Sequence, residues 1–148
     1  MARIATYSKD TSISVDDLLI GTDAEDSNIT KNYKVGDLTP IIKGYKDYVF
    51  SFTQNNTDDP VVTELSNDTG LTFTFTRYST GQFHLVPSDS LDISKTWAQV
   101  TGGNIGASTV LNIKNFQTDL IAIVNVDTAT GTATDDVDTG FVEIRIYP

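Results

Sequence analysis

Cysteine is absent from this chain, basic residues are half as numerous as acidic ones, and no long hydrophobic run occurs. Without cysteine there are no disulfides, thiolate metal sites or cysteine nucleophiles. The formal charge of −10 argues against a surface that follows nucleic-acid phosphates, because such surfaces need clustered Lys and Arg. The longest apolar stretch, residues 120–124, is far short of the ~20 residues that cross a bilayer. We therefore expect no nucleic-acid partner and no membrane partner.

No secretion signal is expected either, since residues 1–20 lack a basic head followed by an apolar run. Charge is unevenly distributed along the chain. Residues 1–46 hold six Lys/Arg against seven Asp/Glu, whereas residues 47–148 hold four against thirteen. This asymmetry fits a nearly neutral attachment segment followed by an acidic, solvated domain.

From residue 45 onward the apolar side chains recur with period two, which is typical of β-strands. In residues 48–53 three aromatic side chains fall on one face, and in residues 71–76 Leu and Phe alternate with threonine. The pattern predicts about eight strands, at residues 48–53, 61–65, 71–76, 81–86, 96–101, 109–113, 120–126 and 141–147.

Between these segments lie short stretches rich in Gly, Asn, Asp, Ser and Pro, which favour turns. Many short strands without a helix-length periodic segment predict an all-β fold. We expect an antiparallel, jelly-roll-like β-sandwich over residues 45–148. The run at residues 120–124 is apolar on both faces, which indicates a central strand or a strand covered by another subunit.

Residues 1–44 contain few large apolar side chains and are predicted to form an extended N-terminal arm. The pattern predicts a short strand at residues 3–7, a capped turn around residues 18–20, and a brief helix that starts at Asp37 or Thr39. Such a segment cannot build a core of its own. We expect it to lie against the β-domain or against a neighbouring protein.

Two stretches of the arm carry the most specific signal in the chain. Residues 17–23 read D-L-L-I-G-T-D, and residues 30–38 read T-K-N-Y-K-V-G-D-L. This pair resembles a segment near the N-termini of structural proteins of tailed bacteriophages, where it precedes the exposed part of a fibre or appendage. Residues 54–96 are similar, more weakly, to a β-domain common in phage and prophage structural proteins.

The resemblance implies a non-enzymatic structural protein located in the virion. It implies an oligomeric appendage, such as a short fibre, a head fibre or an adaptor, docked through its N-terminal segment. Its expected partners are other copies of itself, as a homotrimer, and other virion proteins of the capsid or tail. The residues predicted to form the docking and oligomer interfaces are Leu18, Leu19, Ile20, Tyr33, Val35, Leu38, Phe141 and Tyr147.

Two alternatives remain open at this point. The first is a capsid decoration or cement protein that bridges capsomers. The second is a module that binds a host surface glycan, with exposed aromatic side chains and Asp/Asn loops; Trp97 together with Tyr78 or Tyr45 is the pair considered for stacking on a sugar.

Catalytic and metal sites are weakly indicated. His84 is the only histidine, and Ser79 and Ser88 lie near it in sequence, but no nucleophile-elbow motif is present. The acidic run from Asp135 to Asp138 has oxygen ligands for Ca²⁺ but lacks the spacing of an EF-hand loop. We therefore expect no enzyme activity, no catalytic residue and no cofactor; whether the acidic run binds a cation stays open.

Overall fold

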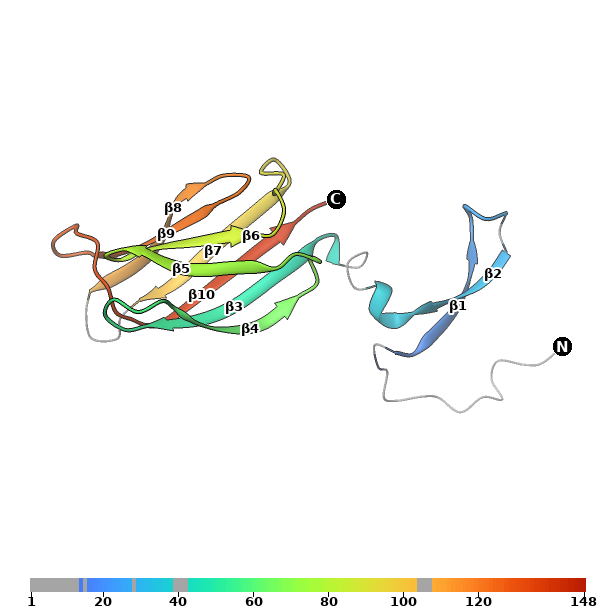
Figure 1. Ribbon diagram of the computed structural model, residues 1–148. Coiled ribbons are helices and arrows are strands. Elements are labelled where there is room, and N and C mark those ends of the chain that lie inside the picture. The colour runs from blue at the N-terminus through green and yellow to red at the C-terminus, as the bar shows by residue number, and fades with distance from the viewer. Residues whose placement is uncertain (1–13, 15, 28, 39–42, 104–107) are drawn as a thin grey trace. The chain divides into compact units, whose positions relative to one another are not determined.

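The computed structural model describes residues 14, 16–27, 29–38, 43–103 and 108–148 (Figure 1). The chain divides into two compact units, Met1–Gly44 and Tyr45–Pro148. The first unit carries a two-stranded sheet and the second carries two four-stranded sheets. In the part of the chain that the structure describes, no helix has the length and apolar character needed to cross a membrane.

The second unit is a sandwich of two antiparallel sheets (Figure 1). The strands of the first sheet, in spatial order, are β4 (Val61–Asn67), β3 (Lys46–Gln54), β10 (Val137–Ile146) and β7 (Thr96–Gly103). Those of the second sheet are β5 (Phe73–Ser79), β6 (Gln82–Pro87), β9 (Ile121–Asp127) and β8 (Thr109–Phe116).

These eight strands coincide with the eight segments predicted by the period-two pattern, although their ends differ; β10, for example, starts at Val137 rather than at Phe141. The prediction of an all-β antiparallel sandwich is confirmed. Eight strands in two four-stranded sheets match a jelly roll in strand number and layering. The connectivity was not predicted: the hairpins β3–β4, β5–β6 and β8–β9 each stay within one sheet, and the other connections cross between the sheets.

Aromatic side chains fill the space between the sheets. Tyr48, Phe50 and Phe52 alternate along β3 and are all buried, as the sequence predicted. They meet the other sheet at Phe75, whose ring centroid lies 5.4 Å from that of Phe50 and 4.9 Å from that of Phe52, both edge to face. Burying one such side chain stabilises a fold by about 1.5–3 kcal/mol, so this cluster supplies much of the driving force.

The apolar run at residues 120–124 is explained by the position of β9, which lies between β6 and β8 in its sheet. Ile121 and Ile123 point into the core and are fully buried. Ala122 faces outward and is still buried, because neighbouring strands flank it on both sides. The run therefore marks a central strand.

The first unit contains an antiparallel hairpin of β1 (Leu18–Asp23) and β2 (Ile29–Lys34), followed by the 3-10 helix η2 (Val35–Leu38). The predicted capped turn around residues 18–20 is wrong, because these residues are strand β1. The Asp23 side chain sets the hairpin turn by accepting hydrogen bonds from the amides of Glu25 and Asp26. This Asx-type turn reverses the chain, and β2 then pairs with β1 in full register.

The 3-10 helix η2 begins at Val35 and ends at Leu38, so it is not the brief helix predicted to start at Asp37 or Thr39. Thr39, the other predicted start, lies outside the described residues, and so does the predicted strand at residues 3–7. Helix η2 is too short to bury a face of its own. The described part of the first unit is therefore a two-stranded ribbon, of the kind that is marginally stable when isolated.

Candidate functional site

The hairpin of the first unit exposes most of its apolar surface. Leu18, Leu19 and Ile20, three of the predicted docking residues, are consecutive in β1, and Ile20 is 78% exposed. Because side chains alternate along a strand, these three residues place apolar groups on both faces of the ribbon. Among the described residues of this unit the ribbon has two strands, and no second sheet of these residues covers either face.

The other predicted residues of the arm are partly buried within the same unit. The Tyr33 ring lies over Gly21, where a Cβ atom would come within 3.1 Å of Cε2. The Val35 amide donates a 2.8 Å hydrogen bond to the Asp17 carbonyl, which ties the start of η2 to the start of β1. Leu38, the last residue of η2, is half-buried. These contacts hold the ribbon in shape and leave β1 as its apolar surface.

An electrostatic contact stabilises the ribbon further. The Lys31 ammonium lies 2.7 Å from an Asp23 carboxylate oxygen and 3.0 Å from one of Asp26. The hydrogen bond between Lys31 and Asp23 lowers the pKa of the Asp23 carboxyl group and raises the pKa of the Lys31 ammonium group. The turn of the hairpin is thus polar and paired, while β1 is apolar.

The second unit has a candidate surface on the outside of the β4-β3-β10-β7 sheet. Residues directly opposite each other on paired strands share a face. Phe141 of β10 stands opposite Ser51 of β3 on one side and Thr101 of β7 on the other. We call this surface the Phe141 face; its side chains are Asp47, Val49, Ser51, Trp97, Gln99, Thr101, Phe141, Glu143 and Arg145. Phe141 is 44% exposed although it lies on a central strand.

One end of the Phe141 face carries an aromatic–arginine cluster formed by Tyr45, Trp97, Arg145 and Tyr147. The Arg145 guanidinium carbon lies 4.8 Å from the ring centroid of Tyr45 and 4.8 Å from that of Trp97. Both distances are typical of cation–π contacts. The rings of Tyr45 and Tyr147 are 5.6 Å apart and tilted by 54°.

Glu143 completes this cluster by accepting a 2.7 Å hydrogen bond from Arg145 Nε. That bond is the main reason why the pKa of Arg145 is raised, and a hydrogen bond with the Tyr147 side chain adds to it. The guanidinium is therefore held in place, while Trp97 and Tyr147 remain 39% and 42% exposed. A neutralised, rigid cation among exposed rings can bind a flat partner through stacking and hydrogen bonds.

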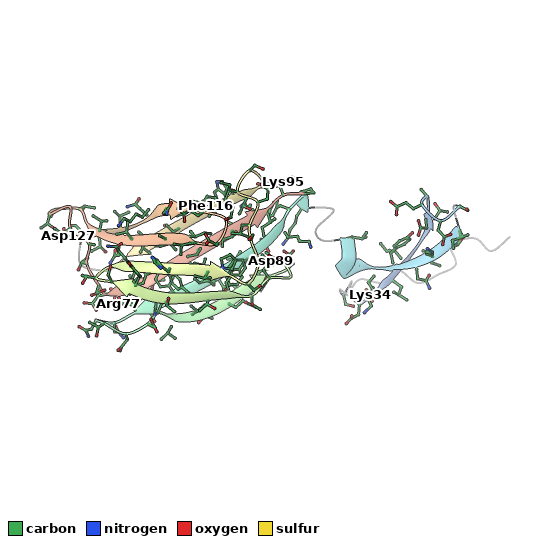
Figure 2. The ribbon with its side chains drawn as sticks, turned by 45° about the horizontal axis from the view of Figure 1, so that its top comes forward. Lys34, Arg77, Asp89, Lys95, Phe116 and Asp127 are labelled. Carbon is green, nitrogen blue, oxygen red and sulfur yellow. The ribbon has the colours of Figure 1, made fainter. Side chains whose placement is uncertain are left out.

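A separate polar cluster closes one end of the sandwich. Arg77 shares its strand face with Phe75, and its guanidinium binds the Asp135 carboxylate through two hydrogen bonds of 2.9 and 2.8 Å. The Gly81 amide donates a third bond, of 2.8 Å, to the same carboxylate. Figure 2 shows Arg77 at the same end of the sandwich as Asp127, opposite to Asp89 and Lys95.

These bonds determine what the acidic run can do. The Arg77 hydrogen bond holds the pKa of Asp135 below its usual range, and Asp136 Oδ1 accepts the amide of Asn56. In the described residues no three His, Asp or Glu side chains are placed to hold a metal ion. Asp135 and Asp136 therefore join the turns of the sandwich.

Two buried amide side chains complete the same end. The side-chain oxygen of Gln54 accepts a hydrogen bond from the Asp136 amide, and its side-chain nitrogen donates one to the carbonyl of Asp58. Asn125 donates to the carbonyls of Thr134 and Asp136, and its Oδ1 is, among the described residues, a buried side-chain atom that lacks a hydrogen-bond partner. This network orders the loops, which explains why polar groups are buried here.

His84 lies on the outer face of the other sheet, where its ring stacks on Tyr78 with 4.1 Å between the centroids. Ser88 is one of the two serines near His84 in sequence, and its hydroxyl oxygen accepts a hydrogen bond from the Thr72 amide. Ser79 ends β5 opposite Gln82. None of these contacts forms the hydrogen-bonded pair of nucleophile and base that covalent catalysis needs.

Phe141 and Tyr147 were predicted as interface residues and lie on or beside one face, whereas the contacts of Arg145 with the aromatic rings were not predicted. Tyr45 and Trp97 were considered for stacking on a sugar, whereas the structure shows both rings against the Arg145 guanidinium. The one available signal was that Arg145 is the only positive charge in the last strand. The eight predicted interface residues fall into two groups, six in the first unit and two in the second, and their role stays a prediction.

The chain was compared with known proteins at three levels. The comparisons with protein-family models, with curated proteins and with solved structures found no match for this chain.

Proposed function

We propose that this chain is a non-enzymatic structural protein of a tailed-phage virion, an oligomeric appendage that docks through its N-terminal unit. The appendage would be a short fibre, a head fibre or an adaptor. Two kinds of support stand behind this proposal: the resemblance of residues 17–23 and 30–38 to phage structural proteins, and the contrast between the two units of the chain.

That contrast is the observation that carries the proposal. The second unit buries an aromatic core between two sheets, whereas the first is a ribbon whose Leu18, Leu19 and Ile20 are exposed. A two-stranded hairpin is marginally stable alone, and three adjacent exposed aliphatic side chains gain free energy when a partner covers them. We expect this contrast in an attachment segment that is joined to a stable β-domain.

A triple substitution tests the docking role. We expect L18S/L19S/I20S to leave the melting temperature of the sandwich unchanged and to lower the amount of the protein in purified particles at least tenfold. The amount is measured by quantitative mass spectrometry of particles grown with the variant gene. The matched control V86S/V110S removes exposed aliphatic side chains from the second unit and should be incorporated normally. Normal incorporation of the triple variant, or absence of the wild-type chain from particles, would contradict the proposal.

The location of the protein on the particle distinguishes an appendage from the alternative of a capsid decoration protein. Imaging of intact particles places its density on the head or on the tail. Loss of a decoration protein should make capsids burst at lower temperature, because such proteins bridge capsomers. Loss of a tail appendage should reduce adsorption to the host and leave capsid stability unchanged.

The aromatic–arginine cluster favours one second candidate function, the binding of a host surface glycan. Exposed rings of Trp97 and Tyr147 suit the flat faces of sugars, and the N–H donors of a held guanidinium suit their oxygens. Trp97 is the only tryptophan, so its fluorescence reports on this cluster alone.

This second candidate predicts a change in Trp97 fluorescence when neutral and acidic bacterial oligosaccharides are titrated up to about 1 mM. The response should be lost in the Y147A variant and kept in Y78A, whose ring lies on the other sheet. If no oligosaccharide changes the fluorescence, glycan binding is refuted and the structural role is the one that remains. No catalytic role is proposed for His84 or Asp135.

A further inference from the structure

We propose that the Phe141 face is the surface on which a second copy of this chain packs. The proposal rests on the oligomeric part of the function proposed above and names the surface that builds the oligomer.

The Phe141 face has the composition of an interface centre. The buried centres of protein interfaces are enriched in aromatic residues and Arg and depleted of unpaired charge. Phe141 is 44% exposed on a central strand, and Trp97, Arg145 and Tyr147 follow at the end of the same face. Trp, Tyr and Arg are also the residues that contribute most to binding at interfaces.

The placement of charge points to a second copy as the partner. Two copies with a formal charge of −10 each repel one another, so they can meet only where the charge is neutralised. The carboxylates on this face are already paired: Glu143 binds Arg145 at 2.7 Å, and Asp47, which is buried, accepts the Ser66 hydroxyl at 3.0 Å. A basic partner would instead be drawn to the acidic turns, of which Asp89 and Asp127 mark two in Figure 2, at opposite ends of the sandwich.

The strand pairing gives Phe141 two neighbours with short side chains. Phe141 stands between Ser51 and Thr101, whose side chains are much shorter than its own, and its ring is 44% exposed. In a contact between two copies, the Phe141 ring of each copy can pack over the short side chains beside Phe141 of the other. Pairing through the free edge strand β4 is less favourable, since β4 follows Pro60 and has a bulge at Leu65, two devices that blunt sheet edges.

The test is the oligomeric state of the full chain, measured by light scattering and analytical ultracentrifugation between about 1 µM and about 1 mM. The wild type should be oligomeric, and the dissociation constant of the F141E oligomer should be at least tenfold higher than that of the wild type. The matched control is Y78E, which adds the same charge at a more exposed aromatic residue on the other sheet and should assemble like the wild type. T101E places the charge beside Phe141 without touching the ring, and covers the case in which F141E melts early.

A wild type that is monomeric over this range, or an F141E protein that folds and assembles normally, would overturn the proposal. A monomer whose Trp97 fluorescence responds to an oligosaccharide would also overturn it and assign the face to carbohydrate. The docking role is tested separately, because incorporation of the chain into particles depends on the first unit. A monomer that is still incorporated would refute this interface and leave the docking role standing.

Discussion

Replacing Gly140 with alanine is expected to lower the free energy of unfolding of the sandwich by about 3 kcal/mol, near the upper end of the usual cost of overpacking a core. Gly140 is buried in β10, directly opposite Phe52 of β3. A Cβ atom at this position would collide with the Phe52 ring. That ring cannot move away cheaply, because Phe52 is fully buried and packs against Phe50, Phe75 and Phe83.

Chemical denaturation measures this effect, and two comparisons identify its cause. G131A is the control for adding a Cβ atom without a collision: Gly131, unlike Gly140, has a left-handed backbone, with φ of 71°, and a Cβ atom there meets nothing within 4 Å. It should cost only about 1 kcal/mol, from backbone strain. In an F52L background, G140A should cost clearly less than in the wild type, since the smaller side chain leaves room. Equal costs in both backgrounds would show that the Phe52 contact is not the reason.

The second large effect is expected at Asp135. We expect D135N to lower the melting temperature of the sandwich at pH 7 by roughly 5 to 10 °C. The substitution removes the negative charge that Arg77 binds through two hydrogen bonds, and the side chains of both residues are less than a fifth exposed. A little-exposed guanidinium without an anion is costly, and the bond from the Gly81 amide weakens as well.

The pH dependence of this effect follows from the lowered pKa of Asp135, which Arg77 holds below its usual value. The unfolded chain has the ordinary pKa of about 3.9. The stabilisation by the ion pair is therefore fully present above that pH and is lost as the pH falls through the lower, folded value. The difference in melting temperature between wild type and D135N should be constant from pH 7 to pH 5 and shrink below about pH 4.

Thermal melts between pH 7 and pH 3 test this expectation. D119N is a suitable control, because Asp119 is an exposed carboxylate whose loss should change the melting temperature little at any pH. A D135N curve that runs parallel to the wild type down to pH 3 would show that the stabilisation does not depend on the charge of Asp135.

Local sequence patterns were sufficient to predict where the strands of the sandwich lie in the sequence. The alternation of Tyr48, Phe50 and Phe52 with smaller or polar side chains predicts a half-buried strand, because only a period of two places all three rings in the core. The same reasoning found the other strands of the second unit. It failed at residues 18–20, where the signal for a hairpin lies in the Asp23 turn and in pairing with residues further along the chain.

Long-range pairing was decided by the tertiary structure alone. The contact of Arg145 with Trp97 needs β10 beside β7, and the Arg77–Asp135 bond joins residues 58 positions apart. Nothing in a local pattern says which strands become neighbours, since every half-buried strand offers the same alternation. That choice depends on how the two sheets bury their inner faces together, and it places Phe141, Trp97 and Arg145 on one outer face.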